Sequence, residues 1–377
     1  MTSRIIILPH SFEPNYTLGF VKGLVSKKID VIVISSDDTD KRLSQAGIEN
    51  INLQGDRSEA RSLIKKIFSQ LSYYVRLLLY LLKNRPDIIH FTGVFRTEFL
   101  FFEGIVLHTF LKLVSKKYIF TAHNILPHNK SGSALFKLLH KFIYALPNVL
   151  LVHTDLSRKQ LINEFGIDEK KISVISIGLN EEVPITGLTK KKARKMLNYE
   201  ENDNVVLFFG KLDEYKGLDT LIESMNIERG KKIKLQVVGW WANHEYKLKI
   251  EKMIANSMQR DNIRLNIEYI SNDEVEKYFV CADVIALPYR KIYQTGVLFL
   301  SLRFGIPVVA TKVGALENYI EKDIGIIAKS NSPEGFSEAL NEYFNEQLVF
   351  DREKIINRAM QYRWENICKK IAHLYIN

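Results

Sequence analysis

Two lysines in the stretch "FFGKLDEYKGLDTLIESM", residues 208 to 225, follow the end of an apolar run. The run predicts a buried strand that ends at Gly210, and Lys211 and Lys216 lie in the turn after it. Gly217 then begins a predicted helix. Two ammonium groups at a strand-to-helix turn can bind the oxygens of a diphosphate, and a glycine there lets the backbone approach the anion. The alternative interpretation is a solvated loop, because lysine is mostly a surface residue.

A second stretch, residues 285 to 311, reads "IALPYRKIYQTGVLFLSLRFGIPVVAT" and combines a polar loop with an apolar helix that begins at Gly296. The loop carries three polar side chains, those of Arg290, Gln294 and Thr295. The N–H groups near Thr295, Gly296 and Val297 would be free at the helix start, so with the helix dipole they predict an anion site. An N-capped helix without a ligand would give the same pattern.

The nonapeptide "TAHNILPHN", residues 121 to 129, places two histidines and two asparagines directly after a predicted strand. It could be a metal site, a catalytic loop, or a turn in which His123 bonds only to backbone. A zinc site needs three or four converging ligands, and no cysteine and few carboxylates lie nearby in the sequence. We therefore favour the catalytic loop over the metal site and over the turn.

Short runs rich in Val and Ile recur along the chain with helical stretches between them. The first series is "RIIIL", "DVIVIS", "DIIHF", "KYIFTAH", "VLLVHT" and "ISVISIG", and the second is "NVVLFFG", "KLQVVG", "NIEYI", "DVIALP", "IPVVAT" and "IGIIA". This alternation predicts parallel sheets with right-handed crossovers. We expect an α/β protein of two Rossmann-like, doubly wound domains, residues 1–182 and 183–361, that face a cleft. Ligands of such folds bind at the carboxyl ends of the strands, where the three stretches above are expected to lie.

The last segment, residues 362–377, has the spacing of an amphipathic helix. Its expected buried set is Trp364, Ile367, Ile371, Leu374 and Tyr375. In the second domain, Trp240 and Trp241 could stack on a base or a sugar, but buried packing is the more common role of tryptophan. The chain has two cysteines, Cys281 and Cys368, which could form one disulfide, although so few thiols fit a reducing compartment better. We expect a cytoplasmic protein.

The net charge of +10 is concentrated in the first half of the chain, where residues 1–180 hold 24 Lys and Arg against 15 Asp and Glu. The same half contains long runs of leucine and aromatic residues, too short and too often interrupted by charge to span a bilayer. Basic side chains beside exposed apolar ones suit an anionic membrane surface. The candidates are Lys65, Lys66, Arg76 and Lys83. Two ordinary core helices with solvated lysines are the alternative, and no motif for nucleic-acid binding accompanies the charge.

Together the stretches at 208–225 and 285–311 resemble the family-4 retaining glycosyltransferases of the GT-B fold (glycosyltransferase group 1). The resemblance extends to "VHTDLSRKQLINEFGIDEKKISVISIG", residues 152–178, and to "GIPVVATKVGALENYIEKDIGIIA", residues 305–328. Four residues of the latter stand at pattern positions, namely Gly305, Pro307, Gly314 and Glu317. The resemblance implies a nucleotide-sugar donor, with a UDP-sugar favoured over a GDP-sugar, no metal cofactor, and a last helix that packs back on the first domain.

The resemblance also implies roles for individual residues. Lys211 and Lys216 would hold the donor diphosphate and stabilise it as it leaves, although the family usually has arginine at the first position. His123 would face the donor sugar and the acceptor, with Asn124 and His128 on the acceptor side. The remaining donor contacts would come from Arg290, Gln294, Thr295, Gly296, Val297 and Glu317.

One departure from the family pattern concerns two glutamates that are commonly eight residues apart. Aligned on Gly305 and Pro307, those positions hold Ile292 and Leu300, which cannot accept hydrogen bonds from hydroxyl groups. Tyr293, Gln294 and Thr295 are the possible substitutes. The departure keeps open a second function, a non-catalytic GT-B subunit that activates a partner transferase. A nucleotide-sugar epimerase on the same fold is a third interpretation, with no carboxylate pattern to support it.

The sequence therefore predicts a retaining hexosyltransferase that moves a sugar from a nucleotide-diphosphate donor to a lipid-linked or glycan acceptor. Polysaccharide, glycolipid and cell-wall assembly all fit this prediction. We expect the protein to be peripheral on the inner face of the cell membrane, with a partner glycosyltransferase as a further possible contact.

Overall fold

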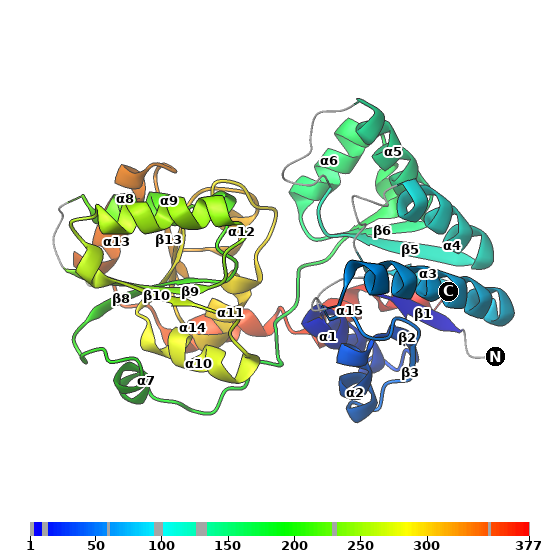
Figure 1. Ribbon diagram of the computed structural model, residues 1–377, viewed down its shortest axis with the longest axis horizontal. Coiled ribbons are helices and arrows are strands. Elements are labelled where there is room, and N and C mark those ends of the chain that lie inside the picture. Colours follow the sequence, from blue (N-terminus) through cyan, green and yellow to red (C-terminus); the bar gives the residue numbers. More distant parts are fainter. Residues whose placement is uncertain are drawn as a thin grey trace. The chain divides into compact units, whose positions relative to one another are not determined.

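The computed structural model describes residues 4–9, 14–58, 61–93, 101–125, 134–227, 232–345 and 348–376. They belong to two compact units (Figure 1). The first unit comprises Met1–Gly178 together with Arg363–Asn377, and the second comprises Leu179–Tyr362. The boundaries expected from the sequence, at residues 182 and 361, fall within a few residues of these.

The first unit is built on a seven-stranded parallel sheet with the order β3-β2-β1-β4-β5-β6-β7. Its strands are β1 (Ile5–Leu8), β2 (Ile32–Ser35), β3 (Asn50–Asn52), β4 (Ile88–Phe91), β5 (Lys117–Ala122), β6 (Val149–Val152) and β7 (Ile172–Val174). The chain winds outward from β1 in one direction through β2 and β3, and in the other through β4 to β7. The order therefore reverses between β1 and β4, which makes the sheet doubly wound.

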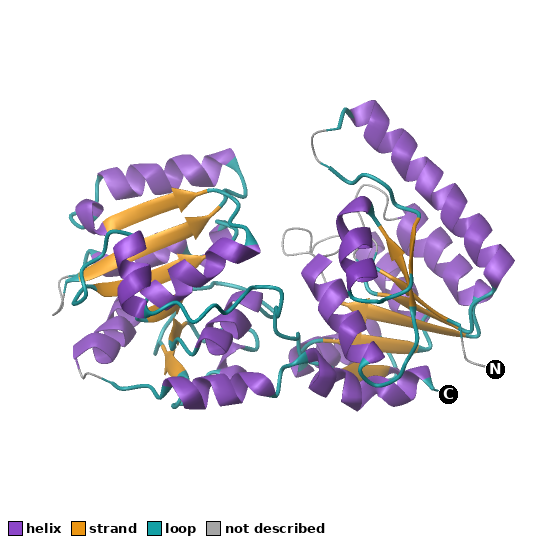
Figure 2. Cartoon of the chain, turned by 90° about the horizontal axis from the view of Figure 1, so that it is seen from below, coloured by secondary structure: helices purple, strands orange, loops and turns teal. Residues whose placement is uncertain are grey.

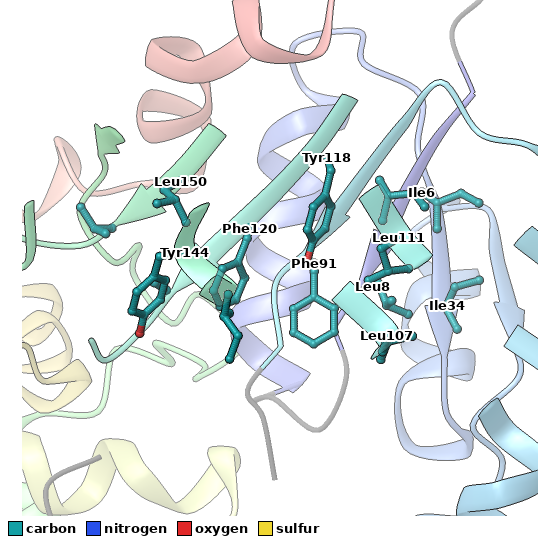
Figure 3. Close-up of a cluster of buried hydrophobic side chains, with 14 of the residues drawn as sticks. Ile6, Leu8, Ile34, Phe91, Leu107, Leu111, Tyr118, Phe120, Tyr144 and Leu150 are labelled. Carbon is teal, nitrogen blue, oxygen red and sulfur yellow. The ribbon is translucent and has the colours of Figure 1, made fainter. Parts of the chain in front are cut away.

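Helices cover both faces of this sheet. One face carries α1 (Pro14–Val25), α2 (Asp37–Gln45), α15 (Trp364–Ile371) and the 3-10 turn η6 (Ala372–Tyr375). The other carries α3 (Leu63–Asn84), the π-helical η2 (Phe102–Leu107), α4 (His108–Val114), α5 (Ala134–Ala145) and α6 (Asp155–Phe165). Figure 3 shows the core under this second face, where Phe91 of β4 lies between Phe120 of β5 and Leu107 of η2. A short 3-10 turn, η3 (Glu169–Lys171), precedes β7.

The carboxyl-terminal helix α15 packs against α1 in the first unit. The five side chains expected to be buried in this segment are all buried. The indole of Trp364 fits because glycines surround it: a Cβ added at Gly19 would lie 2.2 Å from its Nε1, and one at Gly178 would lie 2.3 Å from its Cδ2. Both glycines are therefore required by close packing.

The second unit is built on a six-stranded parallel sheet with the order β10-β9-β8-β11-β12-β13. Its strands are β8 (Asn204–Phe209), β9 (Ile233–Gly239), β10 (Ile263–Ile267), β11 (Val284–Leu287), β12 (Val308–Ala310) and β13 (Gly325–Ile327). The expected strand "NIEYI" was misplaced, because β10 begins three residues earlier and ends before Tyr269. The parallel pairing of both sheets, with helices on either side (Figure 2), confirms the predicted fold class.

The helices of the second unit also form two layers. One layer is α8 (Leu218–Met225), α9 (His244–Ala255) and α13 (Pro333–Asn345). The other is α7 (Lys190–Met196), α10 (Asn272–Cys281), α11 (Gly296–Phe304) and α14 (Arg352–Met360). The short elements are η4 (Glu214–Lys216), η5 (Arg260–Asn262) and α12 (Leu316–Tyr319).

Both cysteines, Cys281 and Cys368, are buried free thiols, so they do not form the disulfide considered above. Within the part of the chain that the structure describes, no helix combines the length and apolarity needed to cross a bilayer.

Candidate functional site

We call the turn that carries Lys211 and Lys216, directly after β8 in the second unit, the lysine turn. Lys216 ends η4, and its side chain is only 7% exposed. Its Nζ lies 5.7 Å from the centre of the Tyr289 ring, and a Cβ added at Gly210 would lie 3.0 Å from it. Burial lowers the pKa of Lys216 to about 8, because a buried ammonium loses hydration. A bound anion would stabilise this ammonium in place of the water that burial removes.

Glycine backbones bring the loops after three strands into contact at this point. Gly217 has a φ of +69°, and a Cβ there would lie 2.0 Å from the carbonyl oxygen of Pro288, after β11. Gly239, the last residue of β9, packs equally closely against Gly210. A Cβ added at Gly239 would lie 1.9 Å from the Gly210 carbonyl oxygen. No other residue fits at either position, so the glycines hold the lysine turn against the loop after β11.

The two lysines have different environments. The side chain of Lys211 is 47% exposed, and its Nζ lies 3.5 Å from Asp213 Oδ2. Lys216 is buried beneath the same turn. Lys211 is therefore a hydrated cation at the rim, whereas Lys216 is a poorly hydrated cation within the site.

Arg290 anchors the loop after β11 to the lysine turn. Its guanidinium lies 2.8 Å from Asp219 Oδ2 and donates to the Glu214 carbonyl oxygen. The backbone N–H of Arg290 donates to the Tyr215 carbonyl oxygen. Asp219 also accepts from Lys249 at 2.7 Å. Burial acts to raise the pKa of Asp219, but the hydrogen bonds from these two cations outweigh it and hold the pKa below its ordinary value. Arg290 thus positions the loop through a buried carboxylate.

The loop after β11 leads into the amino terminus of α11. Thr295 is the N-cap, and its Oγ1 accepts the Val297 N–H at 3.3 Å. That N–H, one of the three expected to bind an anion, therefore already has an acceptor. The N–H groups of Gly296 and Leu298 have no acceptor within the helix. A Cβ added at Gly296 would meet no atom within 4 Å, so the helix start is open.

The helix start and the lysine turn lie at one place. A Cβ added at Gly210 would be 3.7 Å from Val297 Cγ2 as well as 3.0 Å from Lys216 Nζ. A buried ammonium and a helix amino terminus thus flank the end of β8. This combination of a cation, a helix dipole and close-approaching glycine backbone is suited to bind a diphosphate.

Gln294 has an unusual arrangement in the same loop. Its Nε2 donates to the hydroxyl of Tyr319 at 2.9 Å. Its Oε1 is buried and has no hydrogen-bond partner among the residues that the structure describes. A buried carbonyl oxygen without a donor is costly unless a ligand supplies one.

The positions of the missing glutamates are apolar and closed. Ile292 is 9% exposed and Leu300 is 7% exposed. Gly314, with a φ of +57°, lies so close that a Cβ there would be 1.8 Å from the Ile292 carbonyl oxygen. Glu317 lies on α12, which follows β12, and its carboxylate is 3.0 Å from Lys312 Nζ.

Two aromatic side chains are exposed where β9 and β10 end. Trp240 follows β9 directly and is 42% exposed, and its ring centre lies 5.7 Å from that of Tyr269. The expectation that Trp240 would be buried is therefore wrong. Trp241 is only partly exposed and packs against Tyr246 at the edge of the core.

The histidine of the nonapeptide lies at the carboxyl edge of the first unit's sheet. His123 follows β5, is partly buried, and its Nε2 lies 2.8 Å from the Thr92 carbonyl oxygen. Its Nδ1 lies 2.9 Å from Nε2 of His153, which follows β6. Burial, followed by the nearby His153, holds the pKa of His123 well below its usual range. No role was predicted for His153, although both histidines directly follow predicted strands.

The other site residues predicted in the first unit differ in their exposure. Asn124 is exposed, whereas His128 lies outside the described residues. Lys65, Arg76 and Lys83 are exposed on α3, and Lys66 is half-buried. Among the described residues, no group of three or more His, Cys, Asp or Glu side chains has an arrangement that would hold a metal ion.

Both units match models of known protein families. Residues 14–183 match the Glycosyltransferase Family 4 model, and residues 189–362 match the Glycosyl transferases group 1 model. An uncharacterised glycosyltransferase of Methanocaldococcus jannaschii is 24% identical over 66% of this chain and 64% of its own length. A D-inositol 3-phosphate glycosyltransferase of Corynebacterium urealyticum is 24% identical over 60% and 56%. The chain thus matches less than two thirds of the length of these relatives.

A solved structure supports the fold. The crystal structure of HepE from Anabaena in complex with UDP-glucose superposes with a TM-score of 0.75, at 15% identity over 99% of each chain. The two family matches span nearly the whole of both units. The chain therefore belongs to the group 1 glycosyltransferases, with a family 4 amino-terminal unit, on the GT-B fold.

Proposed function

We propose that this protein transfers a hexose from a nucleotide-diphosphate donor to a glycan or lipid-linked acceptor, with retention of configuration. The observation that carries the proposal is the convergence of Lys216 Nζ and the α11 amino terminus on the end of β8. A diphosphate bound there would be neutralised as the glycosidic bond breaks, and stabilising that charge is the main requirement of the reaction.

Each group has a stated part in this mechanism. Lys216 binds the diphosphate within the site, and Lys211 adds a second charge from the rim. The free N–H groups at Gly296 and Leu298 donate to the distal phosphate. The leaving phosphate helps to deprotonate the incoming hydroxyl on the same face of the sugar, which gives retention. The protein's own cations are proposed to do the work that a metal ion does in other transferases.

The donor is proposed to be a UDP-sugar. The related Anabaena fold is described with UDP and with UDP-glucose, which supports this choice. Gln294 Oε1 is the proposed acceptor for a sugar hydroxyl, because Ile292 and Leu300 offer none and this oxygen has no donor among the described residues. Thr295 Oγ1 is already engaged by Val297 N–H and is not needed for it.

A panel of UDP-, GDP- and ADP-sugars, screened by thermal shift, tests the proposal. One donor should raise the melting temperature of the wild type, because a ligand of the native state stabilises it. Lys216→Met should abolish that rise. Lys322→Met, which removes an exposed lysine of the same unit, should leave it intact. A rise that persists in Lys216→Met would contradict the proposed site.

We propose in addition that the first unit contacts an anionic membrane through α3, at the inner face of the cell membrane. One side of α3, with Tyr73, Tyr74, Leu77 and Leu81, packs into the core. A second side is apolar and exposed, with exposed fractions between 46% and 71%. We call it the α3 stripe, and it consists of Ile64, Ile67, Phe68, Leu71, Val75, Leu79 and Leu82.

Charge beside the α3 stripe favours a lipid surface as its occupant. Lys65, Arg76 and Lys83 are separated by about three and then about two helical turns, so they form one basic line next to the stripe. Lys66 lies on a different line of the helix. Each cation near an anionic bilayer contributes about 1 kcal/mol, in addition to burial of the stripe in the interface.

Vesicle co-sedimentation tests this contact. Binding to vesicles with phosphatidylglycerol should fall by roughly 100-fold when Lys65, Arg76 and Lys83 are changed to glutamate. The same charge change at Lys192, Lys195 and Lys322 of the second unit, all exposed, is the control. Equal loss in both triple variants, or unchanged binding in the first, would contradict the proposal.

The second candidate function is a non-catalytic subunit that activates a partner transferase. The buried, apolar Ile292 and Leu300 favour it, because they remove two carboxylates that commonly bind the donor. It predicts a purified protein that stabilises no nucleotide sugar and yet stimulates another transferase. A donor-specific thermal shift with turnover would exclude it.

A further inference from the structure

A chain of hydrogen-bonding groups crosses the carboxyl edge of the first unit's sheet. The Thr92 carbonyl oxygen lies 2.8 Å from His123 Nε2, and His123 Nδ1 lies 2.9 Å from His153 Nε2. His153 Nδ1 in turn lies 3.1 Å from the Ile175 carbonyl oxygen. These four residues directly follow β4, β5, β6 and β7, which are adjacent in the sheet.

The number of protons in this chain is informative. A carbonyl oxygen can only accept, so His123 Nε2 and His153 Nδ1 must both carry hydrogen to bond as they are placed. A neutral imidazole has one N–H, so the two nitrogens that face each other would then both be lone pairs. Three hydrogen bonds need three protons, whereas two neutral rings bring two. All three hydrogen bonds can therefore form at once only when the histidine pair carries one positive charge.

When the third proton is absent, we expect His123, the less buried ring, to change its tautomer. His153 is 3% exposed and is held by Ile175, whereas His123 is partly exposed. If His153 keeps its bond to Ile175, its Nε2 is an acceptor. His123 then satisfies that acceptor by carrying its proton on Nδ1, which leaves Nε2 as a lone pair that must move off the Thr92 carbonyl.

We infer that His153 is a positioning residue that fixes the tautomer of His123: in the neutral pair His123 donates from Nδ1 to His153 and presents Nε2 as a hydrogen-bond acceptor for a substrate hydroxyl. A third proton reverses this, because it restores N–H at Nε2 and binds the ring to Thr92. The tautomer is a property of the free protein, and only the role toward a hydroxyl rests on the proposed glycosyl transfer.

The surroundings of the pair support the neutral form near pH 7. Burial lowers the pKa of His153 to about 4 and that of His123 well below its usual range, and the two carbonyl oxygens act in the opposite direction. Within the part of the chain that the structure describes, the other titratable side chains in contact with the pair are aromatic or neutral. Tyr16 of α1 has its ring 4.9 Å from that of His123.

His90 of β4 is the third histidine of this region, and its ring nitrogens contact Thr121 Oγ1 and the Tyr375 hydroxyl, each at 2.7 Å. Cys368 of α15 lies in the same core as a buried thiol. Burial lowers the pKa of His90 to about 3, so it adds no positive charge beside the pair near neutrality.

Nitrogen-15 NMR of histidine-labelled protein tests the tautomer without any substrate. At pH 8 the signals of His123 should report N–H at Nδ1 and a bare Nε2, and they are assigned by their loss in His123→Gln. In His153→Phe, which removes the acceptor, His123 should change to the Nε2–H tautomer and bond to Thr92. His153→Gln supplies an amide oxygen in place of the ring nitrogen and should retain the Nδ1–H form. An Nε2–H tautomer in the wild type at pH 8, or no change in His153→Phe, would overturn the inference.

Kinetics with the donor that the thermal-shift panel selects test the role of His153 in the reaction. His153→Phe should lower kcat on the order of 10-fold with a smaller change in the KM for the donor, and His153→Gln should recover part of it. The acid limb of the pH profile should move to higher pH in His153→Phe, because the nearby His153 acts to lower the pKa of His123. If the NMR result holds while the wild type turns over no sugar, the tautomer stands and the proposed function fails. Turnover with equal kcat in all three proteins would overturn the role of His153.

Discussion

The lysine turn of the second unit and the histidine pair of the first occupy equivalent places in their own sheets, yet they are built differently. Both lie where parallel strands end, the edge at which doubly wound folds bind ligands. At the lysine turn, glycine backbones in close contact hold a buried ammonium that is charged at neutral pH. At the histidine pair, the Ile175 carbonyl holds His153, His153 fixes His123, and burial keeps both imidazoles neutral. A fixed charge suits an anionic leaving group, and a neutral acceptor suits a hydroxyl.

The lysine turn should be the more fragile of the two sites, because its geometry depends on backbone contacts. We expect Gly217→Ala to destabilise the second unit by roughly 3 kcal/mol or more and to abolish donor binding, since the added Cβ would lie 2.0 Å from Pro288 O. Gly187→Ala is the matched control: it also has a positive φ, of +80°, but its Cβ would meet nothing within 4 Å. It should cost only about 1 kcal/mol. Urea unfolding measures both, and equal losses would show that the contact with Pro288 is unimportant.

The charge of the lysine turn should show itself in the pH dependence of donor affinity. The pKa of Lys216 in the free protein is about 8, so the ammonium is lost as the pH rises through that value. Donor affinity should therefore fall by roughly tenfold per pH unit above about pH 8, provided that the bound diphosphate holds the proton. Calorimetric titration between pH 6.5 and 9.5 measures it. Lys211→Met should weaken binding but keep the same pH dependence, and a flat profile in the wild type would place the diphosphate elsewhere.

The buried ammonium should also cost the free protein stability. Lys216→Met should raise the stability of the second unit at pH 7 by roughly 1 to 3 kcal/mol, because it removes a desolvated charge. The sign follows from the lowered pKa: between about pH 8 and 10.5 the unfolded chain binds more protons, so the wild type becomes more stable as the pH rises. The advantage of the variant should accordingly fade above pH 10. A variant that is less stable than the wild type at pH 7 would show that Lys216 has a structural partner.

The sequence predicted the lysine turn well because its signals are local. A strand, two lysines and a glycine lie within one short stretch, and the structure brings them together with the α11 amino terminus. The histidine pair was only half predicted. His153 belongs to it through the adjacency of β5 and β6, and one histidine after a strand carries no sign of a second one beside it.

Other errors have similar physical causes. Strand β3 was missed because its sequence, Asn50–Asn52, has a single apolar residue and its place depends on pairing with β2. Strand β10 was displaced because Arg264 and Asn266 interrupt its apolar pattern. Trp240 was expected to be buried because packing is the more common role of tryptophan, whereas it directly follows the end of β9 and is exposed there. The ion pair of Arg290 with Asp219 was not predicted, because this carboxylate lies far away in the sequence.

The smallest expected effect separates the nucleotide from the sugar at the lysine turn. Gln294→Leu removes the buried Oε1 that has no described partner together with the Nε2 hydrogen bond to Tyr319. Because the two changes offset each other, the free protein should lose little stability, within about 0.5 kcal/mol. UDP alone should bind as before, because the proposed diphosphate contacts, Lys216 and the α11 amino terminus, are unchanged in this variant. The complete donor should bind roughly fivefold more weakly, the cost of one neutral hydrogen bond to a hydroxyl. Ile292→Val is a suitable control in the same loop. If UDP and the UDP-sugar weaken equally in Gln294→Leu, the amide supports the loop and the sugar hydroxyl is bound by another group, which would leave the lysine turn as a diphosphate site without a sugar contact of its own.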